Sequence, residues 1–274
     1  MICLYVSWMY HPTIYKSRNC CLFVLEGQNT VQPLPGCDPT VYCEEKTPKE
    51  NFLLCAAAVK KAIPGAKYGL GLMYHTGSGT EKSDERAAEM WKDAAKEGDL
   101  RAVFALGLLY ETGSGVPEDM QKAMDLYLEA AHSGLVQAKR KVGMMYEEGI
   151  GFDVSYADAL RWFREAADEG DCMSLFEIGW MSYFGYGCER SEKEAERLIR
   201  KSIDDGALMM LEKQAKIGNA YSQLRLGLLY EMGWGVEQSV FKALVWYTGA
   251  KIMGLKKADK MVRKMESQLC INTE

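Results

Sequence analysis

A short motif occurs five times in this chain at a nearly constant interval. Each copy has an aliphatic residue, a glycine, a tyrosine three residues later in four of the five copies, and two further glycines one residue apart. The first glycine, used below as position 0 of its unit, is Gly71, Gly107, Gly143, Gly179 or Gly227, so the intervals are 36, 36, 36 and 48 residues. A fixed period of roughly 20 to 50 residues is typical of stacked repeats that bury their apolar faces against one another. The chain is therefore predicted to be a repeat protein of five units.

The residues after the paired glycines indicate a second helix in each unit. Position 12 always holds a side chain that can accept a hydrogen bond from a backbone N–H at a helix start, namely Ser83, Asp119, Ser155, Ser191 and Ser239. We also expect a capping box between Ser191 and Glu194. Mostly apolar side chains recur at positions 16, 20 and 23, which lie on one helix face. Glycine at position 27 then ends the helix, because it adopts a left-handed cap without strain.

The motif itself predicts the first helix of each unit. The aliphatic residue before position 0 and the tyrosine after it are four residues apart, hence on one helix face. Glycine at position 0 costs about 1 kcal/mol in helix propensity. We expect this glycine to allow close approach of the second helix, because it has no Cβ. Each unit is thus predicted as a first helix, a glycine-rich loop, a second helix and a tight turn.

The combined pattern A–x3–LG–x2–Y–x2–G–x–G, followed by KA–x2–WY–x2–AA–x2–G, resembles the Sel1-like repeat, a relative of the tetratricopeptide repeat. The resemblance covers residues 47–268 and departs from the pattern at Ser182, which replaces the tyrosine, and at Arg140 and Lys141 in a first helix. It implies an all-α fold, a right-handed superhelical α/α solenoid of helix-turn-helix repeats. Such solenoids carry a concave face lined by their first helices.

The register of the repeat divides the chain into segments. A half repeat is expected to begin at Thr47, where Pro48 and Glu50 complete a helix-start pattern. Twelve extra residues after Gly206 indicate an added short helix. Arg263 takes the place of the next position 0, so the last helix has a charged outer face, as terminal repeats require. The expected segments are an irregular, cysteine-containing extension (1–46), the half repeat (47–62), five repeats (63–255) with the insertion near 207–218, and a capping helix (256–268).

Composition and charge limit the function classes. A net charge of −5 argues against general binding to nucleic acid or to anionic membranes, which favours a basic surplus. The sequence has no apolar run of about 18 residues, so no membrane-spanning helix is predicted. The first ten residues lack the basic start and cleavage site of a secretory signal, so a cytoplasmic location is favoured. Nine cysteines without regular pairing leave the redox compartment open. Residues 1–46 are expected either to pack as an extended strap or to stay disordered.

No motif predicts catalysis, a metal or a cofactor. The cysteines Cys20, Cys21, Cys37 and Cys43 form no CxxC pair, and His11 is the only histidine near them, so zinc ligation is not expected. The other histidines, His75 and His132, occupy different positions of the repeat. GxSxG and Walker signatures do not occur, and GSG and GIG recur only as repeat loops. We therefore expect a protein that is not an enzyme.

The first helices supply the candidate partner-binding residues. By analogy with tetratricopeptide repeats, positions −6, −3, +1 and +4 face the concave side, and aromatic and arginine residues there are typical of interface hot spots. The candidates are Tyr68, Arg101, Phe104, Arg140, Met173, Phe176, Trp180, Tyr183 and Tyr221. The alternative interpretation is that this aromatic stripe, and Trp180 above all, belongs to the core.

The resemblance implies a protein–protein interaction scaffold or adaptor that binds another protein or peptide, without nucleic acid or membrane insertion. One alternative is a secreted β-lactamase-like or cell-wall-associated hydrolase accessory. Relatives with that label carry a cysteine pair in each repeat, which this chain lacks: Cys172 and Cys188 are solitary, and the first three units have none. A second alternative is a structural subunit of a larger complex, with residues 1–46 threading into a neighbour.

Overall fold

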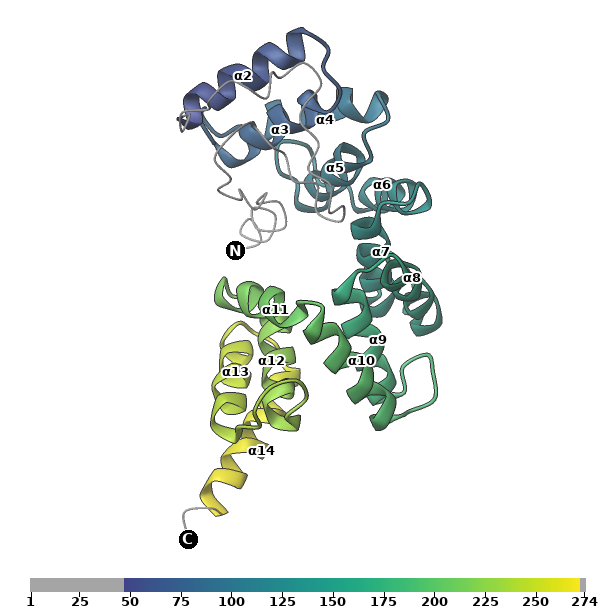
Figure 1. Cartoon of the computed structure of the whole chain (residues 1–274), viewed down its shortest axis with the longest axis vertical. Helices are drawn as coiled ribbons and strands as arrows, with labels where there is room; N and C mark the ends of the chain where they lie inside the picture. Colours follow the sequence, from purple (N-terminus) through teal and green to yellow (C-terminus); the bar gives the residue numbers. More distant parts are fainter. Residues whose placement is uncertain (1–46, 272–274) are drawn as a thin grey trace. The chain divides into compact units, whose positions relative to one another are not determined.

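The computed structural model describes residues 47–271, which form thirteen helices and no strand (Figure 1). The all-α repeat architecture expected from the sequence is confirmed. The first helices of the five units are α3 (Ala66–Thr76), α5 (Leu100–Thr112), α7 (Val136–Glu148), α9 (Cys172–Phe184) and α12 (Ala220–Met232). The second helices are α4 (Asp84–Lys96), α6 (Met120–His132), α8 (Tyr156–Asp168), α10 (Glu192–Asp204) and α13 (Val240–Ile252). The remaining helices are α2 (Pro48–Lys60), α11 (Ala207–Lys216) and α14 (Lys257–Ile271).

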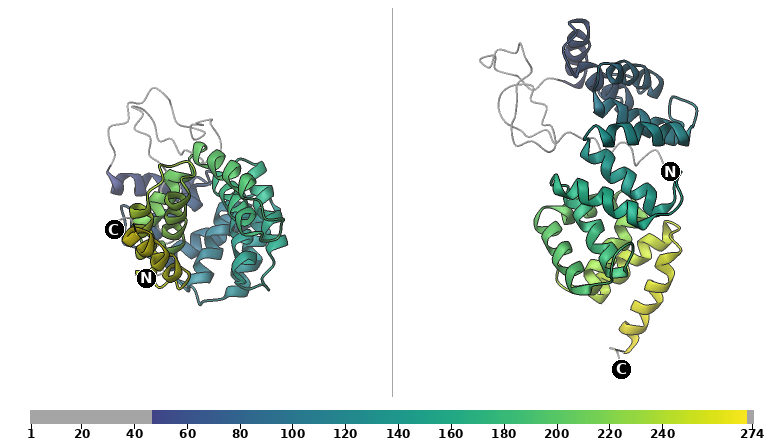
Figure 2. Two further views of the ribbon diagram at one scale, coloured as in Figure 1. Left: turned by 90° about the horizontal axis from the view of Figure 1, so that it is seen from below. Right: turned by 90° about the vertical axis from the view of Figure 1, so that its right-hand side faces the viewer.

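The described chain forms two compact units, which meet in the sequence at Val142 and Gly143, inside α7. The N-terminal unit contains α2 to α6, and the C-terminal unit contains α8 to α14. Within each unit, the two helices of a repeat run side by side, as the further views in Figure 2 show. The predicted extension and its cysteines, residues 1–46, lie outside the described residues.

In every unit, the same two hydrogen bonds cap the second helix and tie its start to the first helix. The side chain at position 12 accepts the backbone N–H three residues later, as expected for an N-cap. The backbone N–H at position 12 donates to the carbonyl at position 3 of the first helix, as in the 2.9 Å bond from Asp119 to Tyr110. The capping box at Thr47 and Glu50 is present. The capping box expected at Ser191 is only half formed, because its side chain accepts the Glu194 N–H but the return bond to the Glu194 carboxylate is not made. The Ser191 N–H donates instead to the Ser182 carbonyl, and the Glu194 carboxylate binds Arg197.

The glycine at position 0 lets the two helices of a repeat touch. A Cβ built on Gly107 would lie 2.6 Å from the ring of Tyr127, and one on Gly227 would lie 2.5 Å from the ring of Tyr247. Both tyrosines are at position 20 and are fully buried. The predicted apolar face of the second helix is therefore confirmed, and its largest side chain fills the space that the missing Cβ leaves.

The twelve-residue insertion forms the predicted short helix, α11. Its buried residues Ala207, Leu211 and Ala215 join the core of the C-terminal unit. Two hydrogen bonds then connect α11 to α12: Ser222 Oγ donates to Gln214 at 2.7 Å, and the Gln223 amide donates to the Ala215 carbonyl at 3.0 Å. The insertion is thus an integral layer of this unit.

The helix α14 packs on α13 with Ala258, Val262 and Met265 buried. Arg263 and its neighbour Lys264 are exposed on the opposite face, as the sequence predicts for a terminal helix. The charge at Lys264 also has a structural partner, since its ammonium lies 2.5 Å from Glu231 of α12.

Candidate functional site

The nine candidate residues occupy different environments. Phe104 and Phe176 are only 1% and 0% exposed, so the expectation that position −3 is solvent-facing is wrong for them. Met173, Trp180 and Arg140 are also buried. The physical reason is that helices such as α5 and α9 are apolar on nearly every side and form a central layer. Four candidates keep accessible surface, of which Tyr68, Arg101 and Tyr183 are half-buried and Tyr221 is exposed.

In the N-terminal unit, the structure brings Tyr68 and Arg101 together. The guanidinium of Arg101 lies 4.6 Å from the centre of the Tyr68 ring, a cation–π contact. It also donates to both oxygens of Asp99 at 2.9 and 2.7 Å, while Asp99 caps the start of α5. The hydrogen bonds to Asp99 raise the pKa of Arg101 further above its usual value. This arginine is therefore a rigidly held cation beside a half-buried aromatic ring.

In the C-terminal unit, five aromatic side chains gather at the end of α9. We call Trp180, Tyr183, Phe184, Tyr186 and Trp234 the α9 aromatic cluster. Tyr183 lies at its centre, with ring centroids 5.9 Å from Trp180, 5.0 Å from Phe184 and 5.4 Å from Trp234. Phe184 also stacks on Tyr186 at 5.3 Å. Both tryptophans are buried, and the other three rings are half-buried, so the cluster has a buried floor and a partly accessible surface.

Three members of this cluster were missed by reasoning on the first helices alone. Tyr186 and Trp234 both occupy position 7, between the paired glycines, where the other units have Ser78, Ser114 and Ile150. Phe184 occupies position 5, where two units have threonine. A comparison of loop positions between the repeats would have revealed the two large aromatics at position 7.

The surroundings of Tyr183 disfavour ionisation of its hydroxyl. Burial, and then the charges of Glu192 and Glu231, raise the pKa of Tyr183 above its usual value. The guanidinium of Arg190 lies 5.7 Å from the centre of its ring. Glu231 itself has structural partners, since it accepts from the Tyr247 hydroxyl and from Lys264, both at 2.5 Å. The cluster thus presents a neutral hydroxyl on an aromatic surface.

A buried ion pair joins α9 to α12. The Arg225 guanidinium donates to Glu177 at 2.5 Å, and both side chains are almost completely buried. Both residues occupy position −2 of their units, so the pair joins two successive first helices. Removing one member of a buried pair leaves an uncompensated charge, which costs about 3–5 kcal/mol. The pair therefore holds α9 and α12, which carry members of the cluster on or just after them, in one arrangement.

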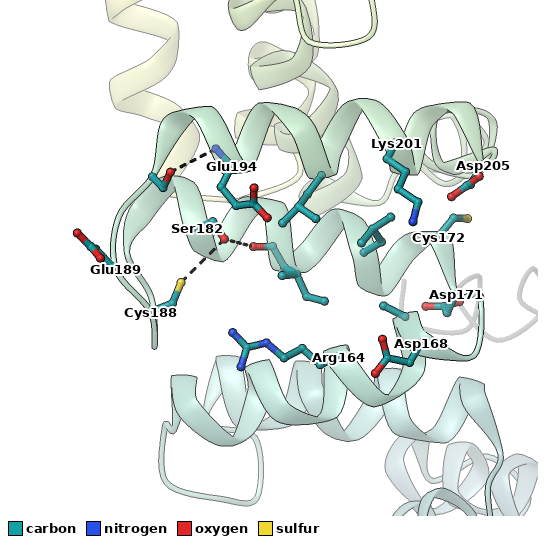
Figure 3. A pocket seen from close by; sticks show the side chains of 16 residues that line it. Arg164, Asp168, Asp171, Cys172, Ser182, Cys188, Glu189, Glu194, Lys201 and Asp205 are labelled. Carbon is teal, nitrogen blue, oxygen red and sulfur yellow. Dashed lines mark hydrogen bonds between the residues drawn. The ribbon is translucent and has the colours of Figure 1, made fainter.

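A pocket of about 550 Å³ lies between α8, α9 and α10 (Figure 3). Leu175, Ile178 and Leu198 line its apolar part, while Arg164 and Lys201 come from opposite walls. Acidic side chains also surround it, so cations and anions are mixed around the opening. Ser182 is buried beside it, with its hydroxyl donating to the Ile178 carbonyl at 2.9 Å. Cys172 and Cys188 line the pocket and form no disulfide, and no histidine lines it.

His75 takes part in a local contact at the start of α4. His75 Nδ1 lies 2.5 Å from Asp84, and its ring is 5.7 Å from that of Trp91. Between residues 47 and 271, no group of three or more metal-ligating side chains comes together. The cysteine cluster considered for zinc lies in residues 1–46, outside the described part. Among the helices described, none is long and apolar enough to cross a membrane.

Comparison with known proteins identifies the repeat. The family model of the Sel1 repeat matches residues 64–99, 100–135, 136–171, 172–206 and 220–251. A crystal structure of a Sel1 repeat protein from Oxalobacter formigenes is 30% identical, with a TM-score of 0.53, and the match covers 78% of this chain and 84% of that one. No curated protein matched the chain.

A second solved structure is that of a protective antigen present in uropathogenic Escherichia coli, which displays an SLR fold. It is 27% identical, with a TM-score of 0.52, and the match covers 78% of this chain. The chain spans only 43% of that antigen's length. The five family matches together cover more than half of the chain and coincide with its five helix pairs. The chain therefore belongs to the Sel1 repeat family.

Proposed function

We propose that this protein is a protein-interaction scaffold that binds another protein or peptide through its first helices, with the α9 aromatic cluster as the main contact. Sel1 repeat proteins generally act as protein-interaction scaffolds and are typically non-enzymatic. The single observation that carries the proposal is the cluster itself, in which half-buried aromatic rings rest on buried ones. We propose no catalytic step.

Two properties make the α9 aromatic cluster suitable for binding. Large aromatic side chains dominate interface hot spots, because they bury a large area and have few rotatable bonds. Here the rings of Tyr183, Phe184 and Tyr186 are held by edge and stacking contacts, so little conformational entropy is lost on binding. The Tyr183 hydroxyl adds one polar group for orientation.

The other accessible candidates are proposed as further contacts, each within its own unit. Tyr68 and Arg101 provide an aromatic ring and a rigid cation in the N-terminal unit, and Tyr221 is exposed at the start of α12. The buried candidates Phe104, Arg140, Met173, Phe176 and Trp180 support the first helices from inside. Their effect on a partner would be indirect, through the position of these helices.

Affinity capture followed by quantitative mass spectrometry tests the proposal. The intact chain is compared with a Tyr183→Ala/Tyr186→Ala variant, which removes two accessible rings. Phe152→Ala is the matched control, because Phe152 is a half-buried loop aromatic that stacks on Tyr146 at 4.3 Å, outside the cluster. We expect the double variant, and not the control, to lose its partner by tenfold or more, with both variants folded by circular dichroism. Equal capture of the partner by all three proteins would refute the proposal that the α9 aromatic cluster is the main contact.

A further inference from the structure

The outer face of α13 carries a line of exposed apolar side chains. Phe241, Val245 and Ile252 are 66%, 51% and 77% exposed. They are spaced by four and seven residues, so they lie along one side of the helix. At 1.5 Å per residue the line is about 16 Å long. We call these three residues the α13 ridge.

The other repeats show that this ridge is not part of the stacking surface. The ridge occupies positions 14, 18 and 25, and in the other four units all the side chains at these positions are exposed. Eleven of those twelve are charged or polar, the exception being Ala157. Position 14 holds Glu85, Gln121, Ala157 and Lys193; position 18 holds Glu89, Asp125, Arg161 and Arg197; position 25 holds Lys96, His132, Asp168 and Asp204. Packing between repeats therefore does not cover these positions, and it does not explain the apolar residues in α13.

The packing face of α13 is elsewhere on the helix. Ala243, Tyr247 and Ala250 are fully buried against the neighbouring helices. Met253, which follows α13 as its C-cap, is also exposed but is not in line with the ridge. Its Cε would be 3.2 Å from a Cβ on Gly218, at the turn that follows α11. The ridge is therefore an additional apolar surface on a helix whose core contacts are complete.

The sequence segment that contains the ridge is rich in positive charge. Residues 240–264 contain seven lysines and arginines and one acidic residue, Asp259, a net charge of +6. Since the whole chain carries −5, the remainder carries −11. Lys242 and Lys251 are exposed beside the ridge on α13 itself, and Lys256 and Lys257 are exposed just beyond its end. Lys251 pairs with Asp259 at 3.0 Å, so the attraction of this segment for an acidic ligand rests mainly on Lys242, Lys256 and Lys257. An acidic ligand is therefore attracted to this segment and repelled by most of the chain.

We propose that the α13 ridge is a docking site for an amphipathic helix of another protein, one with an apolar stripe flanked by acidic residues. A narrow ridge of side chains is the shape that packs into the grooves of a second helix. A second copy of this chain is disfavoured, because pairing through the ridge would bring two +6 segments together. An anionic membrane is disfavoured by the charge of −11 on the remainder. This site is separate from the α9 aromatic cluster, so either can fail without the other.

The test uses the intact chain and a designed peptide helix, with leucines on one side flanked by glutamates. Fluorescence anisotropy measures its binding to the wild-type chain and to a Phe241→Glu/Val245→Glu/Ile252→Lys variant. The three new side chains are those that the first unit has at the same positions, Glu85, Glu89 and Lys96, so the variant is expected to stay folded. We expect at least tenfold weaker binding by the variant, and weaker binding by the wild type when lysines replace the peptide's glutamates. Ala157→Glu, an exposed change of the same net charge, is the control and should bind as the wild type does.

Several outcomes would overturn the proposal. In the first, the glutamate-flanked peptide does not bind the wild-type chain. In the second, the peptide binds the triple variant as tightly as the wild type. A third is a dimer in sedimentation equilibrium that the triple variant loses, which would assign the ridge to a second copy. A fourth is binding to phosphatidylserine-containing vesicles that the triple variant loses, which would assign it to a membrane surface.

Discussion

Replacing Gly107 by alanine is expected to destabilise the N-terminal unit, although alanine is the better helix former. The new Cβ would lie 2.6, 2.9 and 3.1 Å from three atoms of the Tyr127 ring. That ring is fully buried and touches Phe104 at a centroid distance of 5.2 Å. Its hydroxyl donates to Glu111 at 2.6 Å, and Glu111 also binds Lys141. The ring therefore has no free space to move into and is held at both ends.

The magnitude follows from two opposed effects. Alanine in place of a mid-helix glycine stabilises by about 1 kcal/mol. Overpacking a close-packed core typically costs about 1–3 kcal/mol, and the upper end applies here because a shift of Tyr127 also strains its hydrogen bond to Glu111. We therefore expect a net loss of about 2 kcal/mol in the free energy of unfolding.

Urea denaturation of the intact chain, followed by circular dichroism, measures this loss as a lower unfolding midpoint. Gly134→Ala is the control: a Cβ there meets no atom within 4 Å, but the backbone φ is +93°. It should lose about 1 kcal/mol through backbone strain alone. A Gly107→Ala protein at least as stable as the wild type would refute the claim that this glycine is needed for contact between the helices.

Three further predictions concern other contacts. Tyr247→Phe removes the hydroxyl that donates to Glu231 and should lower stability by about 1 kcal/mol, read from the urea midpoint; an unchanged midpoint contradicts it. Glu177→Leu leaves Arg225 buried without its carboxylate and should cost about 3 kcal/mol or more, whereas Glu177→Leu/Arg225→Leu should recover much of this in the same assay. Burial raises the pKa of Cys55 to about 11, so its thiol stays protonated at neutral pH. Its alkylation by iodoacetamide, followed by peptide mass spectrometry, should therefore be slow at pH 8 and accelerate toward pH 11, and a rate already at its plateau at pH 8 would contradict the assignment.

Local chemistry made the helices predictable. A capping side chain at position 12 and a glycine at position 27 each act within one turn of the chain, so their effect does not depend on the tertiary structure. Thr47 and Glu50 form the expected capping box for the same reason. The helix α11 was predictable because Gly218 repeats, twelve residues later, the helix-end signal of Gly206.

Burial and long-range pairing were less predictable, because they depend on neighbours distant in sequence. Phe104 and Phe176 were expected at a surface, yet the helices on either side enclose them. The pairing of Glu177 with Arg225 crosses 48 residues, including the insertion. The Ser191 N–H likewise donates to a carbonyl of the preceding helix, a competitor that a local capping pattern cannot reveal.

The repeat itself supplies the comparison that separates structural from functional residues. Five copies of one backbone pattern impose similar demands on each position, so a side chain required for folding should recur, as the buried residues at position 20 do. When a residue differs from those at the same position of the other units although the backbone is the same, the difference needs another explanation. Tyr186 and Trp234 at position 7, and Phe241 at position 14, are such departures, and each replaces a smaller or a polar side chain of other units. Tyr186 is half-buried and Phe241 is exposed, and surface substitutions usually change stability by less than about 0.5 kcal/mol, so folding alone does not account for these two. Trp234 is buried and packs in the core of its unit. We propose partner binding as the reason for these departures, at the α9 aromatic cluster and at the α13 ridge.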